Sequence, residues 1–148
     1  MSNKKITIVL ASAIIVGVAG YAYFQYTNAP LEAKNGFSQK FPGIEHVSWG
    51  KESEHEWEAE FEMDHSEYAA IFSDDGTWVA TEHEITEKDL PLPVWNVLNE
   101  QFNGYLIDEI EFVERAESTG YQIELENDDE EALIFISSEG KLVSYNHD

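Results

Sequence analysis

The sequence predicts an α+β fold in which two repeats, each a helix followed by an antiparallel β-meander, pack as one compact domain. Apolar residues recur at helical spacing in two short segments, and they alternate with polar residues in several others. Periods of about 3.6 and 2 residues are typical of amphipathic helices and half-buried strands. The two halves of the chain also match each other in order. The length of 148 residues suits one domain of ordinary size.

The N-terminal segment differs from the rest of the chain. Lys4 and Lys5 precede an uncharged, mostly apolar run over residues 6–24. A positive start followed by an apolar run is typical of an export signal. The run is also about long enough to cross a bilayer core as an uncleaved anchor, and a buried core helix is the third interpretation. We predict that residues 1–29 are a signal peptide or N-terminal membrane anchor, and that residues 30–148 lie in the periplasm or at the cell surface.

The exported part begins with a predicted helix over residues 31–41. Ala33, Phe37 and Phe41 recur every four residues and form one apolar stripe. The Pro-Gly pair that follows ends this helix, and Gly36 weakens it.

A strict alternation comes next. Glu occupies every second position from 52 to 62, while Trp57, Ala59 and Phe61 stand between the later ones. This pattern predicts a strand with one buried face and one face of carboxylates. Two further strands are expected at residues 67–73 and 77–84, joined by a hairpin turn at Asp74, Asp75 and Gly76.

The second half starts with another predicted helix. Pro91 and Pro93 are compatible with a first helical turn, whose amides have no intrahelical partner. Gly104 fits the position just after the last turn. The apolar stripe of this helix consists of Val94, Trp95, Val97, Leu98 and Phe102. The strands that follow are predicted at residues 105–115, 121–126, 132–137 and 141–145.

The two halves align as an internal repeat. The order of helix end, acidic strand and hairpin glycine is the same in both. A unit of about 60 residues is marginally stable alone, so the two units are expected to share one core. We place repeat one at about 31–85 and repeat two at about 86–148. The identical pairs are Glu60 with Glu124, Glu62 with Glu126, Asp64 with Asp128, and Gly76 with Gly140.

The charge of the chain limits its partners. There are 30 Asp and Glu against 8 Lys and Arg, a formal net charge of −22, and no Cys. A surface this acidic disfavours binding to nucleic acid and to anionic lipid. The only membrane contact that we predict is through residues 6–24, if they remain uncleaved. The absence of Cys excludes disulfides and thiol catalysis, and it suits an oxidising compartment.

An acidic face is the main candidate binding surface. Alternate carboxylates on a strand lie about 7 Å apart, so they would make a strongly negative surface. Three interpretations stay open: a docking face for a cationic partner, weak calcium binding, and a solvated face that keeps the protein soluble, for example in salty surroundings. The candidate residues are Glu54, Glu56, Glu58, Glu60 and Glu62, with Glu82 and Glu84 on a nearby strand.

Other chemistry finds little support in the sequence. Hairpin geometry explains the Asp74-Asp75-Gly76 turn without calcium, and the five histidines lack metal-ligand spacing. Nucleophile-elbow, phosphate-loop and dinucleotide motifs are absent, so we predict no enzyme, no cofactor and no dedicated metal site. The four tryptophans are expected to be core anchors, and Trp78, beside a hairpin tip, is the candidate for an exposed aromatic.

Several short motifs occur together in a fixed order. They are Phe-x-x-x-Phe-Pro at 37–42, Val-Ser-Trp at 47–49, Tyr-Ala-Ala-Ile-Phe at 68–72, Asp-Gly-Thr-Trp at 75–78, Leu-Pro-x-x-Val at 90–94, Phe-Asn-Gly-Tyr at 102–105 and Gly-Lys-Leu at 140–142. This arrangement resembles the PepSY-like family, whose fold is similar to that of β-lactamase-inhibitor proteins, over about residues 31–146.

The resemblance implies a function class. It implies a non-catalytic, exported binding module of the cell envelope, inhibitor-like in character, that contacts an envelope or secreted protein. Together with the acidic face it favours a cationic partner. The alternative is an acidic cation-binding or salt-adapted structural protein without a specific protein partner.

Overall fold

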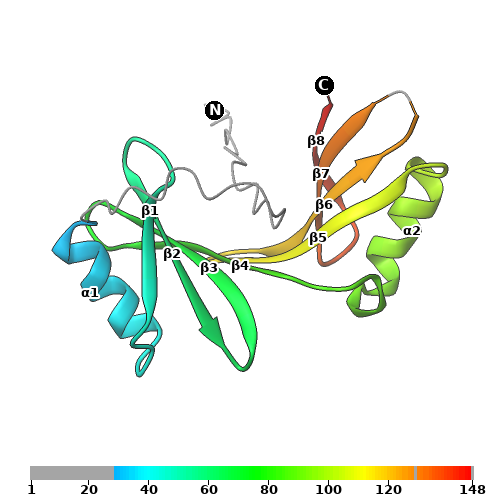
Figure 1. Ribbon diagram of the computed structural model, residues 1–148. Coiled ribbons are helices and arrows are strands. Elements are labelled where there is room, and N and C mark those ends of the chain that lie inside the picture. Colours follow the sequence, from blue (N-terminus) through cyan, green and yellow to red (C-terminus); the bar gives the residue numbers. More distant parts are fainter. Residues whose placement is uncertain (1–28, 129, 148) are drawn as a thin grey trace.

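The structure is a computed structural model that describes residues 29–128 and 130–147 (Figure 1). The signal peptide or anchor predicted at 1–29 lies outside these residues except for Ala29. No helix among the described residues is long and apolar enough to cross a membrane. The elements in order are α1 (Leu31–Lys40), β1 (Val47–Lys51), β2 (Glu56–Met63), β3 (Ser66–Ser73), β4 (Trp78–Glu84), the 3-10 turn η1 (Glu87–Asp89), α2 (Leu92–Gln101), β5 (Leu106–Arg115), β6 (Thr119–Glu126), β7 (Glu131–Ser137) and β8 (Leu142–His147).

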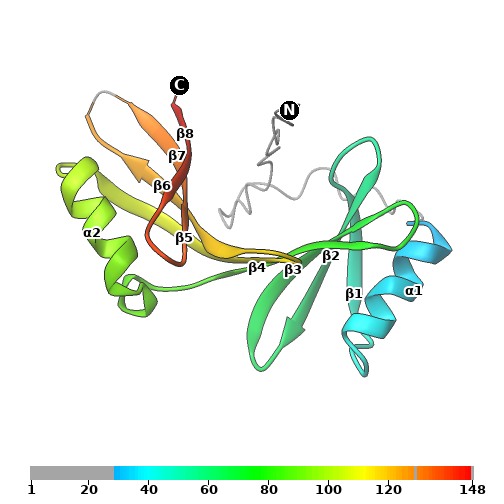
Figure 2. The same cartoon turned by 180° about the vertical axis from the view of Figure 1, so that it is seen from behind.

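The strands form a single antiparallel sheet of eight, in the order β1 to β8. Each strand pairs with the next one in sequence, including β4 with β5, where Ala80 lies opposite Arg115 and Glu84 opposite Glu111. The connection that contains α2 therefore returns the chain to the strand it left. Figures 1 and 2 show α1 beside the first strands and α2 beside the last ones, at opposite ends of the sheet.

The predicted fold class is wrong. One meander runs through all eight strands; only α1 precedes it, and α2 is inserted between its fourth and fifth strands. The chain is not two helix-plus-meander repeats packed against each other. The physical reason is that β4 and β5 join through backbone hydrogen bonds, which every residue type can make, so side-chain patterns carried no signal for this junction.

The apolar core is divided accordingly. Phe37 of α1 packs on Phe61 and Phe72, whereas Val94 and Leu98 of α2 pack in a separate cluster. The predicted core shared by two packed units is therefore not what holds the chain together. The second cluster lies under α2 and includes Ile110, Tyr121, Ile123, Leu125 and Ile134.

Both helices cover the same face of the sheet. Phe61, under α1, lies opposite Tyr68 on β3, and Phe112 on β5 lies opposite Tyr121, under α2. Between them, the imidazole of His83 contacts both the Tyr68 and the Phe112 rings, so a continuous line of rings joins the two clusters. The centroid distances are 5.7 Å for Phe61–Tyr68, 4.7 Å for Tyr68–His83, 5.6 Å for His83–Phe112 and 5.4 Å for Phe112–Tyr121.

The long acidic strand predicted from residue 52 is shorter than expected. The backbone amides of Glu52 and Ser53 both donate to the carbonyl of Glu56, which closes a tight turn after β1. Residues 52–55 therefore form the β1–β2 connection, and β2 begins at Glu56. β1 itself was not expected, because five residues with one glycine give too short an alternation to recognise.

The helix predicted at 31–41 is confirmed as α1, and its glycine has a packing role. A Cβ atom on Gly36 would lie 2.2 Å from the carbonyl oxygen of Gly76, in the β3–β4 turn. Gly76 has the expected positive φ, at 85°. The helix backbone thus approaches the turn more closely than any side chain would allow.

We predict that Gly36→Ala destabilises the protein, although alanine is the better helix former by about 1 kcal/mol. The added methyl group meets backbone atoms that cannot turn away, and such overpacking costs about 1–3 kcal/mol. Chemical denaturation monitored by far-UV circular dichroism measures the change. Ser38→Ala, at an exposed position of the same helix, should change the unfolding free energy by less than about 0.5 kcal/mol. A stability gain for Gly36→Ala would contradict the close approach.

Candidate functional site

The sheet face opposite the two helices is the candidate functional site, and we call it the open face. Side chains alternate between the two faces of a strand. Since Ala59 and Phe61 lie under α1, the open face of β2 carries Glu58, Glu60 and Glu62. Because Ile110 lies under α2 and Phe112 lies on the same side, β5 presents Glu111 and Val113 to the open face.

The structure separates the predicted candidates into two groups. Five lie on strands with open-face parity: Glu58, Glu60, Glu62, Glu82 and Glu84. The other two lie at the β1–β2 connection. Glu54 is an exposed loop residue, and Glu56, at the first position of β2, accepts a hydrogen bond from the Ser53 hydroxyl at 3.1 Å.

Trp78, the candidate for an exposed aromatic, packs on the helix-covered side of the sheet. Its side chain is half-buried against the α1 cluster, and its indole N–H donates to the Thr81 hydroxyl at 2.9 Å. The Lys40 ammonium lies 3.4 Å from the centre of its ring, which is a cation–π contact. This tryptophan therefore ties α1 to β4.

The centre of the open face is apolar. Ile71, Ala80, Val113 and Phe135 form a third buried cluster there. The Arg115 guanidinium lies 4.9 Å from the centre of the Phe135 ring. A Cβ on Gly120 would lie 2.5 Å from that ring, so Phe135 lies directly over the glycine. Carboxylates thus surround an apolar patch.

Glu52 and Glu58 share a hydrogen bond between their carboxyl groups, beside this patch. Burial, followed by the charge of Glu82, raises the pKa of Glu52 to about 7. Burial, followed by the charge of Glu52, raises the pKa of Glu58 to about 7 as well. One proton held between two carboxyl groups relieves their repulsion. The solvated ladder considered from sequence does not describe this pair.

Glu111 and Gln122 form a second pair, on β5 and β6. Their side chains are only 3% and 2% exposed. The Gln122 amide donates to Glu111 Oε2 at 2.8 Å. Burial raises the pKa of Glu111 to about 8, with further contributions from Glu82 and Glu109. Glu82 is itself 2% exposed.

Sequence reasoning missed this second pair as site residues. The alternation of Glu109 and Glu111 with Ile110 and Phe112 was the available signal on β5, and Gln122 lies between Tyr121 and Ile123 on β6. A cavity of about 340 Å³ lies further along the same strands. Its lining includes Asp108, Glu124, Glu126 and Glu131, so the negative surface continues toward β7.

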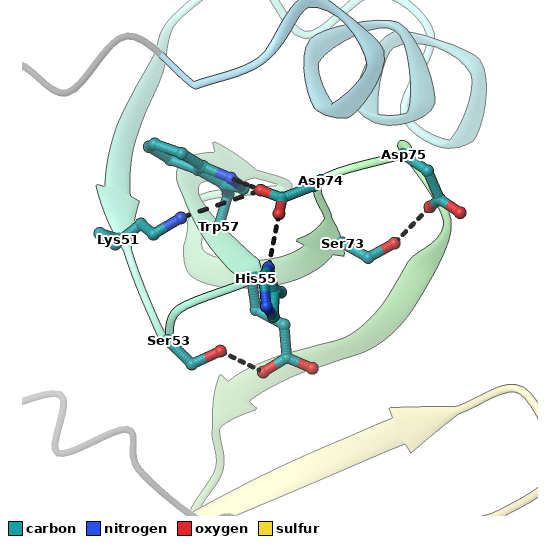
Figure 3. A network of polar contacts seen from close by, with 8 residues as sticks. Lys51, Ser53, His55, Trp57, Ser73, Asp74 and Asp75 are labelled. Carbon is teal, nitrogen blue, oxygen red and sulfur yellow. Dashed lines mark hydrogen bonds and ion pairs between the residues drawn. The ribbon is translucent and has the colours of Figure 1, made fainter.

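The Asp74-Asp75-Gly76 turn has its own partners (Figure 3). The Asp74 carboxylate accepts from the Trp57 indole at 2.7 Å and contacts His55 Nδ1 at 2.9 Å. The Trp57 hydrogen bond, followed by that of His55, lowers the pKa of Asp74. Asp75 accepts from the Ser73 hydroxyl at 2.5 Å. The turn therefore holds the β1–β2 connection in place through these contacts. No group of three metal-ligating side chains occurs among residues 29–128 and 130–147.

Fold and site together define a class: an antiparallel sheet protein with helices on one face and an acidic open face around an apolar centre. Residues 55–144 match the model of the family described as "Putative beta-lactamase-inhibitor-like, PepSY-like". The chain belongs to this PepSY-like family. No curated protein sequence matches it.

Solved structures from Bacteroides share the fold. A DUF2874 family protein of Bacteroides ovatus has a TM-score of 0.74 at 19% identity, covering 82% of this chain and 89% of its own. A BLIP-like protein of Bacteroides fragilis has a TM-score of 0.71 at 19% identity, with 83% and 89% covered. A protein of Bacteroides eggerthii, described with the words "putative periplasmic proteins", has a TM-score of 0.73 at 17% identity, with 82% and 90% covered.

The buried carboxyl groups make stability depend on pH. The folded pKa values of Glu58, about 7, and Glu111, about 8, exceed the ordinary 4.5, so the folded chain keeps protons that the unfolded chain releases. This stabilisation is fully present below pH 4.5 and is lost as the pH rises through 7 to 8. We therefore predict a lower urea midpoint at pH 9 than at pH 5.

The variant Glu58→Gln should remove part of this dependence. At pH 9 it should raise the unfolding free energy by about 1–3 kcal/mol, because one pKa unit corresponds to about 1.4 kcal/mol. At pH 5 it should have little effect, since the wild-type carboxyl group is protonated in the folded state. Glu62→Gln, exposed on the same face of the same strand, is the control and should show a smaller difference. Equal pH profiles for wild type and Glu58→Gln would contradict the burial of this carboxyl group.

Proposed function

We propose that this protein is a non-catalytic, exported binding module of the cell envelope, and that its open face binds a cationic segment of an envelope or secreted protein. The supporting observation is the asymmetry of the sheet. Both helices cover one face, whereas carboxylates from β2, β4, β5 and β6 gather on the other around the apolar cluster of Ile71, Ala80, Val113 and Phe135.

A cluster of carboxylates on one sheet face is suited to the recognition of a positive partner. The four apolar residues among them are already buried, at 0–8% exposed, so the attraction comes from the carboxylates, which supply orientation and long-range steering. Burial, and after it the charges of neighbouring carboxylates, raises the pKa values of Glu52, Glu58 and Glu111. A cationic partner would offset that repulsion, so the interaction should weaken with salt.

Two further observations support the export and the class. The N-terminal segment with Lys4 and Lys5 before the run 6–24 has the pattern of an export signal. The similar structure from Bacteroides eggerthii is described as periplasmic, which agrees with an exported protein. The Bacteroides fragilis neighbour is described as BLIP-like, which favours a protein ligand and makes inhibition of an exported hydrolase one form of this function.

A comparison of two triple variants tests the proposal. The first, Glu60→Gln with Glu62→Gln and Glu84→Gln, removes three charges from the open face. The second, Glu32→Gln with Glu100→Gln and Glu114→Gln, removes three charges from exposed positions on α1, on α2 and on the helix-covered side of β5. Isothermal titration of the full chain with a hexalysine peptide at low salt measures the affinity.

We expect the open-face triple to bind hexalysine about tenfold more weakly than wild type, because three contacts of about 0.5 kcal/mol each add to about 1.5 kcal/mol, and about 1.4 kcal/mol corresponds to a factor of ten. The control triple should bind within about twofold of wild type. An equal loss in both would mean that only net charge attracts the peptide, which favours an acidic protein without a docking face and contradicts the proposal.

A further inference from the structure

One cross-strand row on the open face contains unsatisfied polar atoms. The row runs over neighbouring strands through Glu84, Glu111, Gln122, Phe135 and Ser144. Three atoms in it are buried and have no hydrogen-bond partner among the described residues 29–128 and 130–147. They are Glu111 Oε1, Gln122 Oε1 and Ser144 Oγ.

Such atoms are costly. A buried polar group without a partner has lost its hydrogen bonds to water without replacement, and folded proteins keep few of them. Here all three occur in the same row of one sheet face. The Gln122 amide nitrogen donates to Glu111 Oε2 at 2.8 Å, which leaves the carbonyl oxygen of Gln122 without a donor. These atoms are therefore the candidate acceptors for an external donor.

The chemistry of that donor follows from the three atoms. When Glu111 is ionised, which a bound positive charge favours, its oxygen and the amide oxygen of Gln122 are acceptors, and a hydroxyl oxygen can accept as well. Glu82, Glu109 and Glu124 bear negative charge close to Glu111, so a positive donor is favoured over a neutral one. A single carboxylate beside an amide and a hydroxyl is a poor set for a metal ion.

A guanidinium group suits two neighbouring acceptors better than an ammonium group. Glu111 and Gln122 lie directly opposite each other on β5 and β6, so their acceptor oxygens are neighbours. The planar guanidinium carries five N–H donors in a fork and can reach two acceptors at once, whereas an ammonium is a compact point charge. The chain's own Arg115 has other partners, because it lies against the Phe135 ring and interacts with the charge of Glu82.

We propose that the Glu111 and Gln122 side chains, which are buried in the free protein, turn outward to form a socket for one arginine side chain of the cationic partner. The inference rests on the proposed function, because it names the group that the open face recognises. The arginine donates to Glu111 Oε1 and to Gln122 Oε1, and the positive charge compensates the buried carboxylate. The surrounding carboxylates act as a rim that attracts cations of any kind, while the socket distinguishes arginine from lysine.

Binding of two peptides to the full chain tests the socket. Wild type, Glu111→Gln and Glu114→Gln are titrated with hexa-arginine and with hexalysine at the same ionic strength. Both substitutions remove one charge from β5, but Glu114 is exposed on the helix-covered side. We expect Glu111→Gln to weaken hexa-arginine binding about tenfold or more and hexalysine binding about threefold or less. Glu114→Gln should stay within about twofold for both.

A second variant protects the test against a folding defect. Gln122→Met removes the unpaired amide oxygen without changing the charge, and it should also weaken hexa-arginine binding. Thermal melting verifies that each variant is folded. Glu111→Gln should melt at or above the wild-type temperature, because it replaces a buried carboxyl group by a neutral group of the same shape.

The outcomes separate the two proposals. If hexa-arginine binds Glu111→Gln and Gln122→Met as well as wild type, while the open-face triple variant loses it, the socket is overturned and the proposed function stands. An equal loss of both peptides in Glu111→Gln would overturn the assignment to arginine. If wild type binds neither peptide at low salt, the proposed function and the socket both fail.

Discussion

The backbone pairing between β4 and β5 is the constraint on which the rest of the structure depends. It joins two four-stranded halves into one sheet. It also determines which side chains of the later strands lie on the same face as those of β1 to β4. Because side chains alternate along strands, this single register places the apolar residues of both halves on the same face. The two helices then cover that face at its two ends, and the carboxylates lie on the opposite face.

The open face is the result of this arrangement rather than of a general excess of acid. Carboxylates in the middle of a twisted sheet are flanked by neighbouring strands, so several of them are shielded from water. Glu82 and Glu111 are almost fully buried, and Glu52 and Glu58 share a proton. Burial disfavours the charged form of a carboxyl group, so the chain holds protons on this face at neutral pH. The proposed cationic partner would therefore offset more repulsion on this face than on a fully solvated one.

Close backbone contacts hold the helices on the covered face. Gly36 of α1 lies against the turn that contains Gly76, and in the second half Gly140 lies against Pro93 of α2. Each helix is thus seated on the hairpin turn of its own half of the sheet. The line of rings through Tyr68, His83 and Phe112 continues the apolar contact between the helices, where neither of them covers the sheet.

The sequence by itself determined the local structure. Apolar spacing predicted α1 and α2, alternation predicted the buried and acidic sides of β2, and Gly76 and Gly140 were correctly expected at hairpin turns, where both have positive φ. These features depend on neighbours within a few residues, which the sequence displays directly. The tertiary structure alone decided that the strands form one sheet, that Glu111 meets Gln122, and that Asp74 meets Trp57 and His55. Those contacts join residues 11 to 19 positions apart, and strand register, set by backbone hydrogen bonds common to all residue types, brings them together.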